Sequence, residues 1–282
     1  MNTWLVGSHQ GLYESRDGDS WKRVHDYDFR ITSIVRTPQK VCVSTGSGLW
    51  QISEQPLWIQ LHDETLTEVL DLAFLPGDPG IVAASTYGVA TGYREKNGVV
   101  RWVWHSDRLP VNARYTNTVV AETANRWVIG TEAGVLVTED AGKTWQHSNL
   151  MGCAVRVLYC DDQGWWAGTD GRGIWTSCDG LRWQPSGVGL DGVTIYDIAP
   201  AGKRLIAGTD RGVVVGHGND AWLEVGLHTF VAAVAAHPQH PDFWMAGCLP
   251  GGLWVTHSGG AEWQQVAGMS NVEVILPPEG MA

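Results

Sequence analysis

The chain has 282 residues, of which 44% are hydrophobic and 17% are charged, and its formal net charge is −11 at pH 7. This hydrophobic fraction is enough for a large core and excludes an intrinsically disordered chain. The negative charge argues against a nucleic-acid partner, because binding to the phosphate backbone needs clustered Lys and Arg. The 35 glycines and 16 tryptophans favour an all-β repeat protein.

One phrase recurs along the whole chain: a Gly or Ser, a tight turn, a short apolar strand, a polar turn and, last, a tryptophan. "GTEAGVLVTEDAGKTW" is the most complete copy. The copies begin, in chain order, at Gly7, Ser44, Ser85, Gly130, Gly168, Gly208 and Gly247. A period of about 40 residues in an all-β chain is typical of β-propeller blades.

Each copy contains four short stretches in which apolar and polar residues alternate. In the copy at Gly130 these stretches cover residues 116–122, 126–130, 134–139 and 144–148. A period of two with Gly and Asp between the stretches indicates antiparallel strands joined by turns. Each copy is therefore predicted to be one four-stranded blade.

The two ends of the chain predict how the blades are completed. Residues 3–8 match the second strand of a blade, and residues 271–279 match a first strand that has no followers. An open sheet edge costs stability and promotes aggregation. We therefore predict an all-β, seven-bladed β-propeller of four-stranded antiparallel blades, in which the C-terminal strand is innermost and joins the three N-terminal strands. The propeller is expected to form a single domain over residues 1–282.

The polar turn of three copies has a common pattern: "SRDGDSW" from Ser15, "TEDAGKTW" from Thr138 and "SCDGLRW" from Ser177. These stretches resemble Asp-box repeats, also called BNR repeats. An Asp side chain accepts backbone N–H groups across its own turn, and Gly supplies a positive φ. Asp17, Asp140 and Asp179 are therefore interpreted as structural residues. "THSGGAEW" keeps the frame, with Ser258 in place of the aspartate.

Within the Asp-box family, the chain looks most like the photosystem II stability and assembly factor or uncharacterised bacterial relatives, and it also resembles sortilin-type and xyloglucanase-type propellers. Sialidase-like propellers usually carry an Arg-Ile-Pro motif, which is absent here. Xyloglucanase-like enzymes use two propellers with a cleft between them. The assembly factor implies an Arg-rich surface, which a chain with 19 Lys plus Arg does not clearly supply. The resemblance thus implies a fold more than a function.

Strand direction places the loops before each first strand on one face, together with the loops between second and third strands. Ligand sites of such folds usually lie in a concave mouth of this kind. The residues predicted at this channel mouth are His9, Arg30, Glu68, Arg114, Tyr115, Tyr196, Asp197, His228 and Glu273. Both charges and two tyrosines suit a peptide or a small polar molecule. The alternative is a solvated rim whose charges pair with one another.

No catalytic signature accompanies these residues, so we expect a non-catalytic binding or assembly module whose partner is a protein, a peptide or a small polar ligand. The alternative is an enzyme with its site at the same mouth, either glycoside hydrolase-like or a lyase or cyclase. Its acid and base would come from Glu68, Glu132, Asp197 and Glu273. Without HxH or HExxH spacing, no metal and no cofactor are expected.

The five cysteines are an odd number without CxxC spacing, and we interpret them as buried thiols of a reducing compartment. The N-terminus shows no signal-peptide pattern, and no apolar run suits a membrane span. A cytoplasmic monomer without a membrane partner is therefore expected, although the mature domain of an exported protein would show the same N-terminus.

Overall fold

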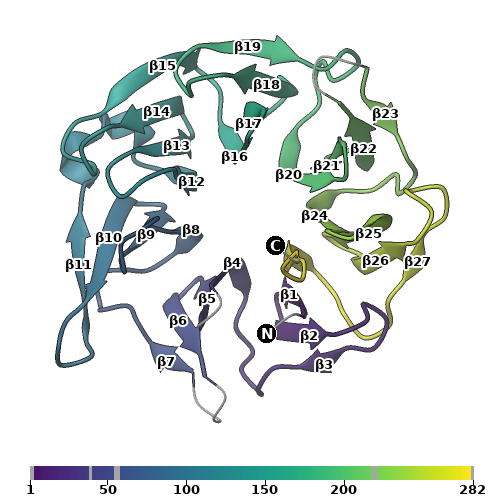
Figure 1. The fold of residues 1–282 in the computed structure, drawn as a ribbon, viewed down its shortest axis with the longest axis horizontal. Coiled ribbons are helices and arrows are strands. Elements are labelled where there is room, and N and C mark those ends of the chain that lie inside the picture. The colour runs from purple at the N-terminus through teal and green to yellow at the C-terminus, as the bar shows by residue number, and fades with distance from the viewer. Residues whose placement is uncertain (1–2, 38–39, 54–57, 218–220, 281–282) are drawn as a thin grey trace. The chain divides into compact units, whose positions relative to one another are not determined.

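The structure is a computed structural model that describes residues 3–37, 40–53, 58–217 and 221–280. The described residues form seven four-stranded antiparallel sheets, which confirms the predicted class of seven-bladed β-propeller (Figure 1). Their helices are two 3-10 turns, Ser106–Arg108 and Val111–Ala113. In this part of the chain no helix has the length and apolar character needed to cross a membrane.

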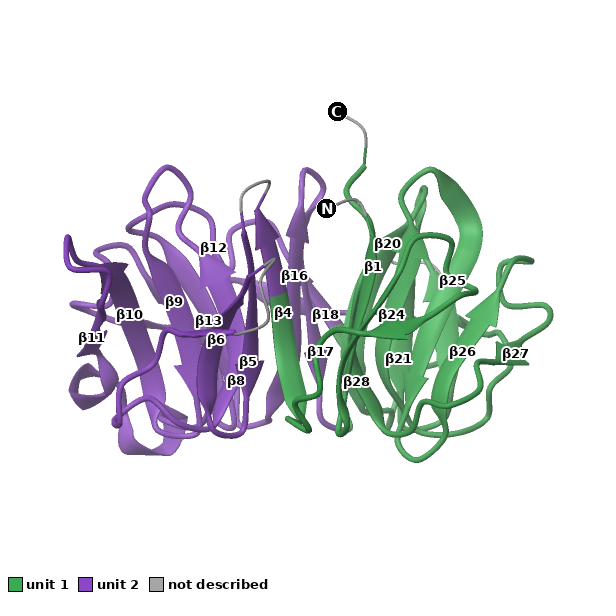
Figure 2. Ribbon diagram, turned by 90° about the horizontal axis from the view of Figure 1, so that it is seen from below, with its two compact units in different colours: residues 1–34, 171–174, 186–282 green, residues 35–170, 175–185 purple. Residues whose placement is uncertain are grey.

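The chain divides into two compact units, which Figure 2 shows in different colours. The first unit comprises residues 1–34, 171–174 and 186–282, and the second comprises residues 35–170 and 175–185. The expectation of a single domain stays a prediction.

The first unit holds three complete sheets. Their strands, in the order in which they pair, are β28 (Val272–Leu276), β1 (Trp4–Ser8), β2 (Gly11–Ser15) and β3 (Lys22–Arg23); β20 (Ile195–Ala201), β21 (Arg204–Thr209), β22 (Val213–Gly216) and β23 (Leu223–Glu224); and β24 (Val231–His237), β25 (His240–Cys248), β26 (Gly252–Thr256) and β27 (Gln264–Gln265).

The second unit holds two complete sheets and most residues of two more. The complete ones are β8 (Val69–Phe74), β9 (Ile81–Ser85), β10 (Gly88–Arg94) and β11 (Val100–Trp104), and β12 (Thr116–Ala121), β13 (Trp127–Thr131), β14 (Gly134–Thr138) and β15 (Gln146–Met151). The others are β4 (Ile31–Thr37), β5 (Lys40–Thr45), β6 (Gly48–Ile52) and β7 (Ile59–Gln60), and β16 (Val155–Asp161), β17 (Gly164–Thr169), β18 (Ile174–Ser177) and β19 (Trp183–Ser186). The division between the units falls within β4, β18 and β19.

The blade made from both chain ends has the predicted composition. β28 pairs with β1 in antiparallel register, with Leu276 opposite Leu5 and Val274 opposite Gly7; Figure 2 shows the two strands side by side. A Cβ on Gly7 would lie 2.5 Å from the Val274 side chain, so the close approach of the two strands requires glycine here. The C-terminal strand therefore completes the N-terminal sheet.

The recurring Gly-Ser/Thr turn has a local physical cause. In the β13–β14 turn, the buried Thr131 hydroxyl donates to the Gly134 carbonyl at 2.9 Å and accepts from the Ala133 N–H at 3.1 Å. Gly134 has φ +130°, and a Cβ on it would meet the Leu150 carbonyl at 2.3 Å. A short hydroxyl side chain and a glycine thus close a turn whose polar groups are hidden from water.

The alternating apolar residues form clusters inside each unit. In the first unit, Trp4, Met245 and Val272 belong to one cluster and are fully buried. Trp127 has the same role in the second unit, where its cluster includes Val82 and Ala84 of β9 in the neighbouring sheet. These contacts join strands of different sheets, which explains the high tryptophan content.

All five cysteines are free thiols, but their burial differs. Cys42 and Cys248 are buried, and burial raises the pKa of each thiol to about 11. Cys153 and Cys160 are partly buried, whereas Cys178 is exposed. The prediction of buried thiols is therefore wrong for Cys178, because this residue follows Ser177 in a polar turn and not in a strand.

Candidate functional site

The first strand of six blades contains a β-bulge near its beginning. The pairing register shifts there, and one residue has no partner on the next strand. A bulge re-aims the side chain of the extra residue and is frequent next to functional sites. These bulge residues are Leu70, Asn117, Arg156, Tyr196, Ala232 and Glu273.

The bulge residue Glu273 is the centre of a three-residue cluster in the first unit. Its Oε2 accepts from Arg30 Nε and its Oε1 from Arg30 Nη2, both at 2.8 Å. His9 Nε2 also lies 2.8 Å from Oε1. The Glu273 side chain is only 11% exposed, whereas that of Arg30 is 58% exposed. The structure thus joins two predicted residues of the blade made from both chain ends, His9 and Glu273, with Arg30 before β4 of the next blade. We call these three residues the His9–Arg30–Glu273 cluster.

A second polar cluster surrounds the bulge residue Arg156 in the second unit. Arg156 Nη1 donates to Glu132 Oε1 at 2.8 Å, and Nη2 donates to Asp170 Oδ2 at 2.7 Å. Asn117 Nδ2 donates to the same Glu132 oxygen at 3.1 Å. We call these four residues the Arg156 cluster. Like His9, Glu132 and Asp170 follow a second strand, so both clusters join a bulge residue to residues of such turns.

Sequence reasoning did not select Arg156 or Asn117. Their signal is positional, because "VRVLYCD", "TNTVVAE" and "NVEVILPPE" align so that Arg156, Asn117 and Glu273 hold equivalent places. The same alignment includes Tyr196, whose ring stacks edge-on against Phe230 with centroids 4.4 Å apart.

Asp197 has a structural role in this geometry. Asp197 Oδ1 accepts from the backbone N–H of the next residue, Ile198, and Oδ2 accepts from the backbone N–H of Val234, both at 2.8 Å. Asp71 makes the same two kinds of contact, to Leu72 and to Val119. Each carboxylate therefore braces its own first strand against the next blade's first strand, and both oxygens of Asp197 are occupied.

The remaining predicted residues lie in separate local contacts. Glu68 Oε2 accepts from Thr86 Oγ1 at 2.7 Å. Arg114 Nη2 lies 3.8 Å from Asp107 Oδ1, and the adjacent Tyr115 is exposed. His228 Nδ1 lies 4.0 Å from Glu224 Oε2, and both side chains are exposed. None of these contacts includes a member of the His9–Arg30–Glu273 cluster.

The three aspartates of the motif turns bind their own turns. Asp17 Oδ1 accepts from the Ser20 N–H at 2.8 Å, Asp140 Oδ1 from Thr144 at 2.8 Å and Asp179 Oδ1 from Arg182 at 2.8 Å. These backbone hydrogen bonds lower the pKa of Asp17 and that of Asp140 to about 2, and they lower the pKa of Asp179 still further. Ser258 stands in the same position and accepts from the Glu262 N–H at 3.0 Å. A hydroxyl thus replaces the carboxylate in this turn.

The described residues contain no group of three or more His, Cys, Asp or Glu side chains that could hold a metal ion. In both polar clusters an arginine pairs with the carboxylates, and such side chains can offer hydrogen bonds to a ligand without a metal.

Comparison with known proteins agrees with the fold. No family model matches the chain, and no curated protein matches it either. Among solved structures, an extracellular domain assigned to a hybrid two-component system of B. thetaiotaomicron is 16% identical, with a TM-score of 0.66; the match covers 90% of this chain and 42% of that one. The GH74 xyloglucanase of Xanthomonas campestris is 15% identical, with a TM-score of 0.63 and coverages of 93% and 46%.

YCF48 from Cyanidioschyzon merolae is of similar size. It is 14% identical, with a TM-score of 0.66, and the match covers 90% of this chain and 91% of that chain. By contrast, the chain spans less than half the length of the other two proteins. At these identities the likeness establishes the propeller fold, which serves both enzymes and other proteins.

Proposed function

We propose that this protein is a non-catalytic binding module that recognises a peptide or a small polar ligand through the His9–Arg30–Glu273 cluster. The observation that carries the proposal is the state of Glu273. Both of its oxygens are held by the Arg30 guanidinium, with His9 as a third partner. To exchange a proton with a substrate, Glu273 would first have to give up these charge-assisted hydrogen bonds.

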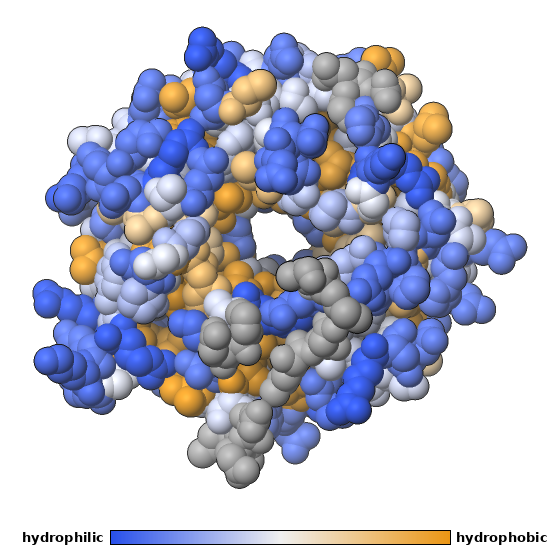
Figure 3. Space-filling view, in the orientation of Figure 1, coloured by the Kyte–Doolittle hydropathy of each residue, from blue (hydrophilic) through white to orange (hydrophobic). Residues whose placement is uncertain are grey.

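The same arrangement suits recognition. A bidentate carboxylate fixes the guanidinium plane of Arg30, while 58% of the side chain remains exposed. A donor held in place loses little conformational entropy when it binds, which increases affinity. Figure 3 shows the opposite face, at which β1 begins and β28 ends, and hydrophilic residues predominate there.

The structural neighbours and the motif turns support a finer proposal about ancestry. Turns at Asp17, Asp140 and Asp179 share their aspartate hydrogen bonds and a glycine of positive φ. We therefore propose that the chain is an Asp-box propeller that acts as a binding or assembly factor. The five free thiols support a reducing compartment such as the cytoplasm.

Selection from a displayed random peptide library tests the binding proposal. The strongest peptide selected on the wild-type protein is synthesised, and its dissociation constant is measured for wild type, Arg30→Ala and Glu273→Gln. Arg204→Ala is the matched control, because Arg204 pairs with Asp242 at 2.7 Å at the start of β21 in the same unit. We expect an at least tenfold loss, about 1.4 kcal/mol, for the first two variants and less than twofold for the control. Equal affinity of wild type and Arg30→Ala would refute the proposal.

One observation favours an enzyme as the alternative. Arg156 holds two carboxylates on one guanidinium, and it does so through Glu132 Oε1 and Asp170 Oδ2, whereas Arg30 holds both oxygens of Glu273. Paired carboxylates are the machinery of glycoside hydrolysis. Under this alternative, a panel of chromogenic glycosides and lactones is turned over by the wild type, and Glu132→Gln abolishes the turnover.

A further inference from the structure

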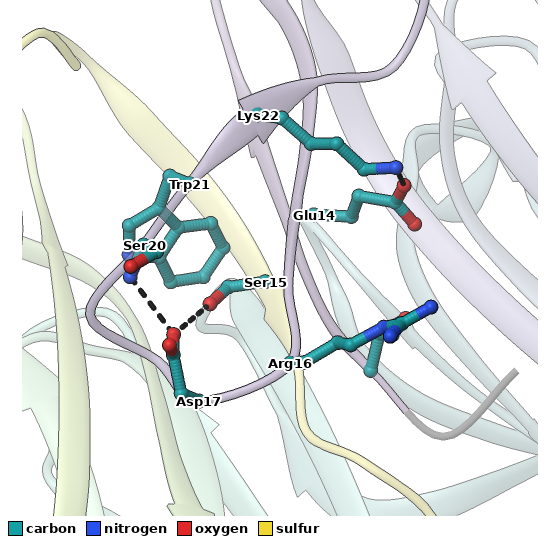
Figure 4. Close-up of a pocket in the computed structure, with 8 residues that line it drawn as sticks. Glu14, Ser15, Arg16, Asp17, Ser20, Trp21 and Lys22 are labelled. Atoms are coloured by element: carbon teal, nitrogen blue, oxygen red, sulfur yellow. Dashed lines mark hydrogen bonds and ion pairs between the residues drawn. The ribbon is translucent and has the colours of Figure 1, made fainter.

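A pocket of about 690 Å³ lies at the end of the β1–β2 hairpin remote from His9. It is lined by Thr3, Glu14, Ser15, Arg16, Asp17, Ser20, Trp21 and Lys22, all from the first unit (Figure 4). Its size is within the range of small-molecule sites. The proposed peptide surface does not include it, so its ligand is a separate question.

Arg16 is the cation of this pocket that lacks a partner. Among the described residues it makes no ion pair or hydrogen bond. The residues that hold its place in two other motif turns do have contacts: Glu139 pairs with Arg126 at 2.9 Å, and the His257 ring stacks on Phe243 with centroids 4.3 Å apart. A guanidinium presents parallel N–H groups that match a carboxylate. The pocket therefore has a place for one carboxylate.

The second cation and the first acid of the pocket are already paired. Lys22 Nζ lies 2.6 Å from Glu14 Oε1, as the dashed line in Figure 4 shows. A ligand ammonium group would have to displace Lys22 from Glu14. The other acid of the lining, Asp17, already has its charge compensated by three hydrogen bonds from its own turn. Both facts disfavour an amino acid and favour a ligand whose only charge is negative.

The rest of the lining suits a ring with hydroxyl groups. Trp21 packs against the core on one side and lines the pocket on the other, so it offers the pocket an apolar surface. Its orientation is fixed, because Nε1 donates to the Gly18 carbonyl at 2.9 Å. The three hydrogen bonds from the turn all go to Asp17 Oδ1, and Oδ2 can accept from a ligand hydroxyl. Ser20 also lines the pocket, and its hydroxyl can both donate and accept.

We propose that this pocket binds an acidic sugar, a pyranose with one carboxylate. The carboxylate pairs with Arg16, the sugar ring lies against Trp21, and hydroxyl groups bond to Asp17 Oδ2 and Ser20.

Calorimetric titration of the full chain with D-glucuronate tests this assignment, with D-glucose and inorganic phosphate as comparison ligands. We expect one glucuronate per chain, bound at least tenfold more tightly than either comparison ligand. Arg16→Ala should abolish the preference for glucuronate over glucose, and Trp21→Phe should weaken both sugars. Arg182→Ala, which removes a cation from an equivalent motif turn, and Arg30→Ala should leave glucuronate binding unchanged.

Three results would overturn the assignment. They are the absence of binding heat with glucuronate, phosphate binding as tightly as glucuronate, and a preference that survives in Arg16→Ala. Arg16 is exposed, so its replacement does not threaten folding. Since Arg30→Ala tests the peptide surface independently, failure of one proposal leaves the other intact.

Discussion

Deletion of residues 271–282 removes the strand that completes the first blade, and its cost follows from the burial of β28. Val272 is fully buried and Ile275 is 7% exposed, and both belong to the cluster that contains Trp4. Burial of one such side chain is worth about 1.5–3 kcal/mol, so the two together contribute about 3–6 kcal/mol. Each lost backbone hydrogen bond to β1 adds about 1 kcal/mol. The total is comparable with the whole stability of a typical domain, about 5–15 kcal/mol.

Thermal unfolding by calorimetry, with light scattering after size exclusion, measures this effect. We expect the truncated chain to unfold or aggregate, because β1 becomes an open edge. Deletion of residues 279–282 is the control, since Glu279 and Gly280 are exposed. The milder Ile275→Ala should cost about 2–5 kcal/mol and lower the melting temperature by about 4–10 °C. A monomeric truncated chain with an unchanged melting temperature would show that β28 does not hold the blade together.

Three further predictions concern the turns, a histidine and the Arg156 cluster. Asp140→Ala should lower the melting temperature without changing peptide binding. Turn hydrogen bonds lower the pKa of Asp140 from 3.8 to about 2, so this stabilisation is present above pH 3.8 and is lost as the pH falls towards 2. The melting temperatures of wild type and variant should therefore converge near pH 2. Burial, followed by the neighbouring His240, lowers the pKa of His237 below 6.5. The unfolded chain therefore binds the extra proton first, and stability falls as the pH drops below about 6.5. His237→Phe should flatten the dependence of the melting temperature on pH between about pH 7 and pH 5, and an unaltered slope would contradict this. A double-mutant cycle of Arg156→Ala and Glu132→Gln, measured by urea unfolding, should give a coupling free energy of about 0.2–1 kcal/mol, because both side chains are partly exposed. A coupling free energy above about 3 kcal/mol would contradict this, since it would indicate a buried pair.

The parts of the fold that could be predicted are those that the chain repeats. The turn that contains Thr131 and Gly134 needs a small hydroxyl and a glycine for reasons that lie within a few residues. Such local requirements leave the same letters in most copies, so their spacing revealed the blades. The completion of the first blade followed from counting strands at the two ends.

The site was harder to predict because a bulge breaks the period of two. Past a bulge, each residue faces the opposite side from the one that simple alternation assigns. Asp197 was selected from its place at the start of a first strand, and its contact with the Val234 N–H depends on the next blade. Arg156 was not selected, because its pairing with Glu132 joins residues of different blades. His9, Arg30 and Glu273 were selected singly, but their contact depends on the pairing of β28 with β1.

The bulge residues also explain how a repeated fold can acquire one particular function. The turn positions are constrained by backbone hydrogen bonds, but a bulge residue stands outside the ladder, and its side chain can change at little cost to the sheet. The six bulge residues named above, from the part of the chain that the structure describes, are all different in type, and two of them, Arg156 and Glu273, are charged. Each of these two binds one residue from outside its own sheet, Arg30 for Glu273 and Glu132 for Arg156, whereas Ala232 offers no polar group to do so. Substitution at a bulge residue should therefore alter recognition and preserve the fold, and substitution of a buried turn hydroxyl should do the reverse.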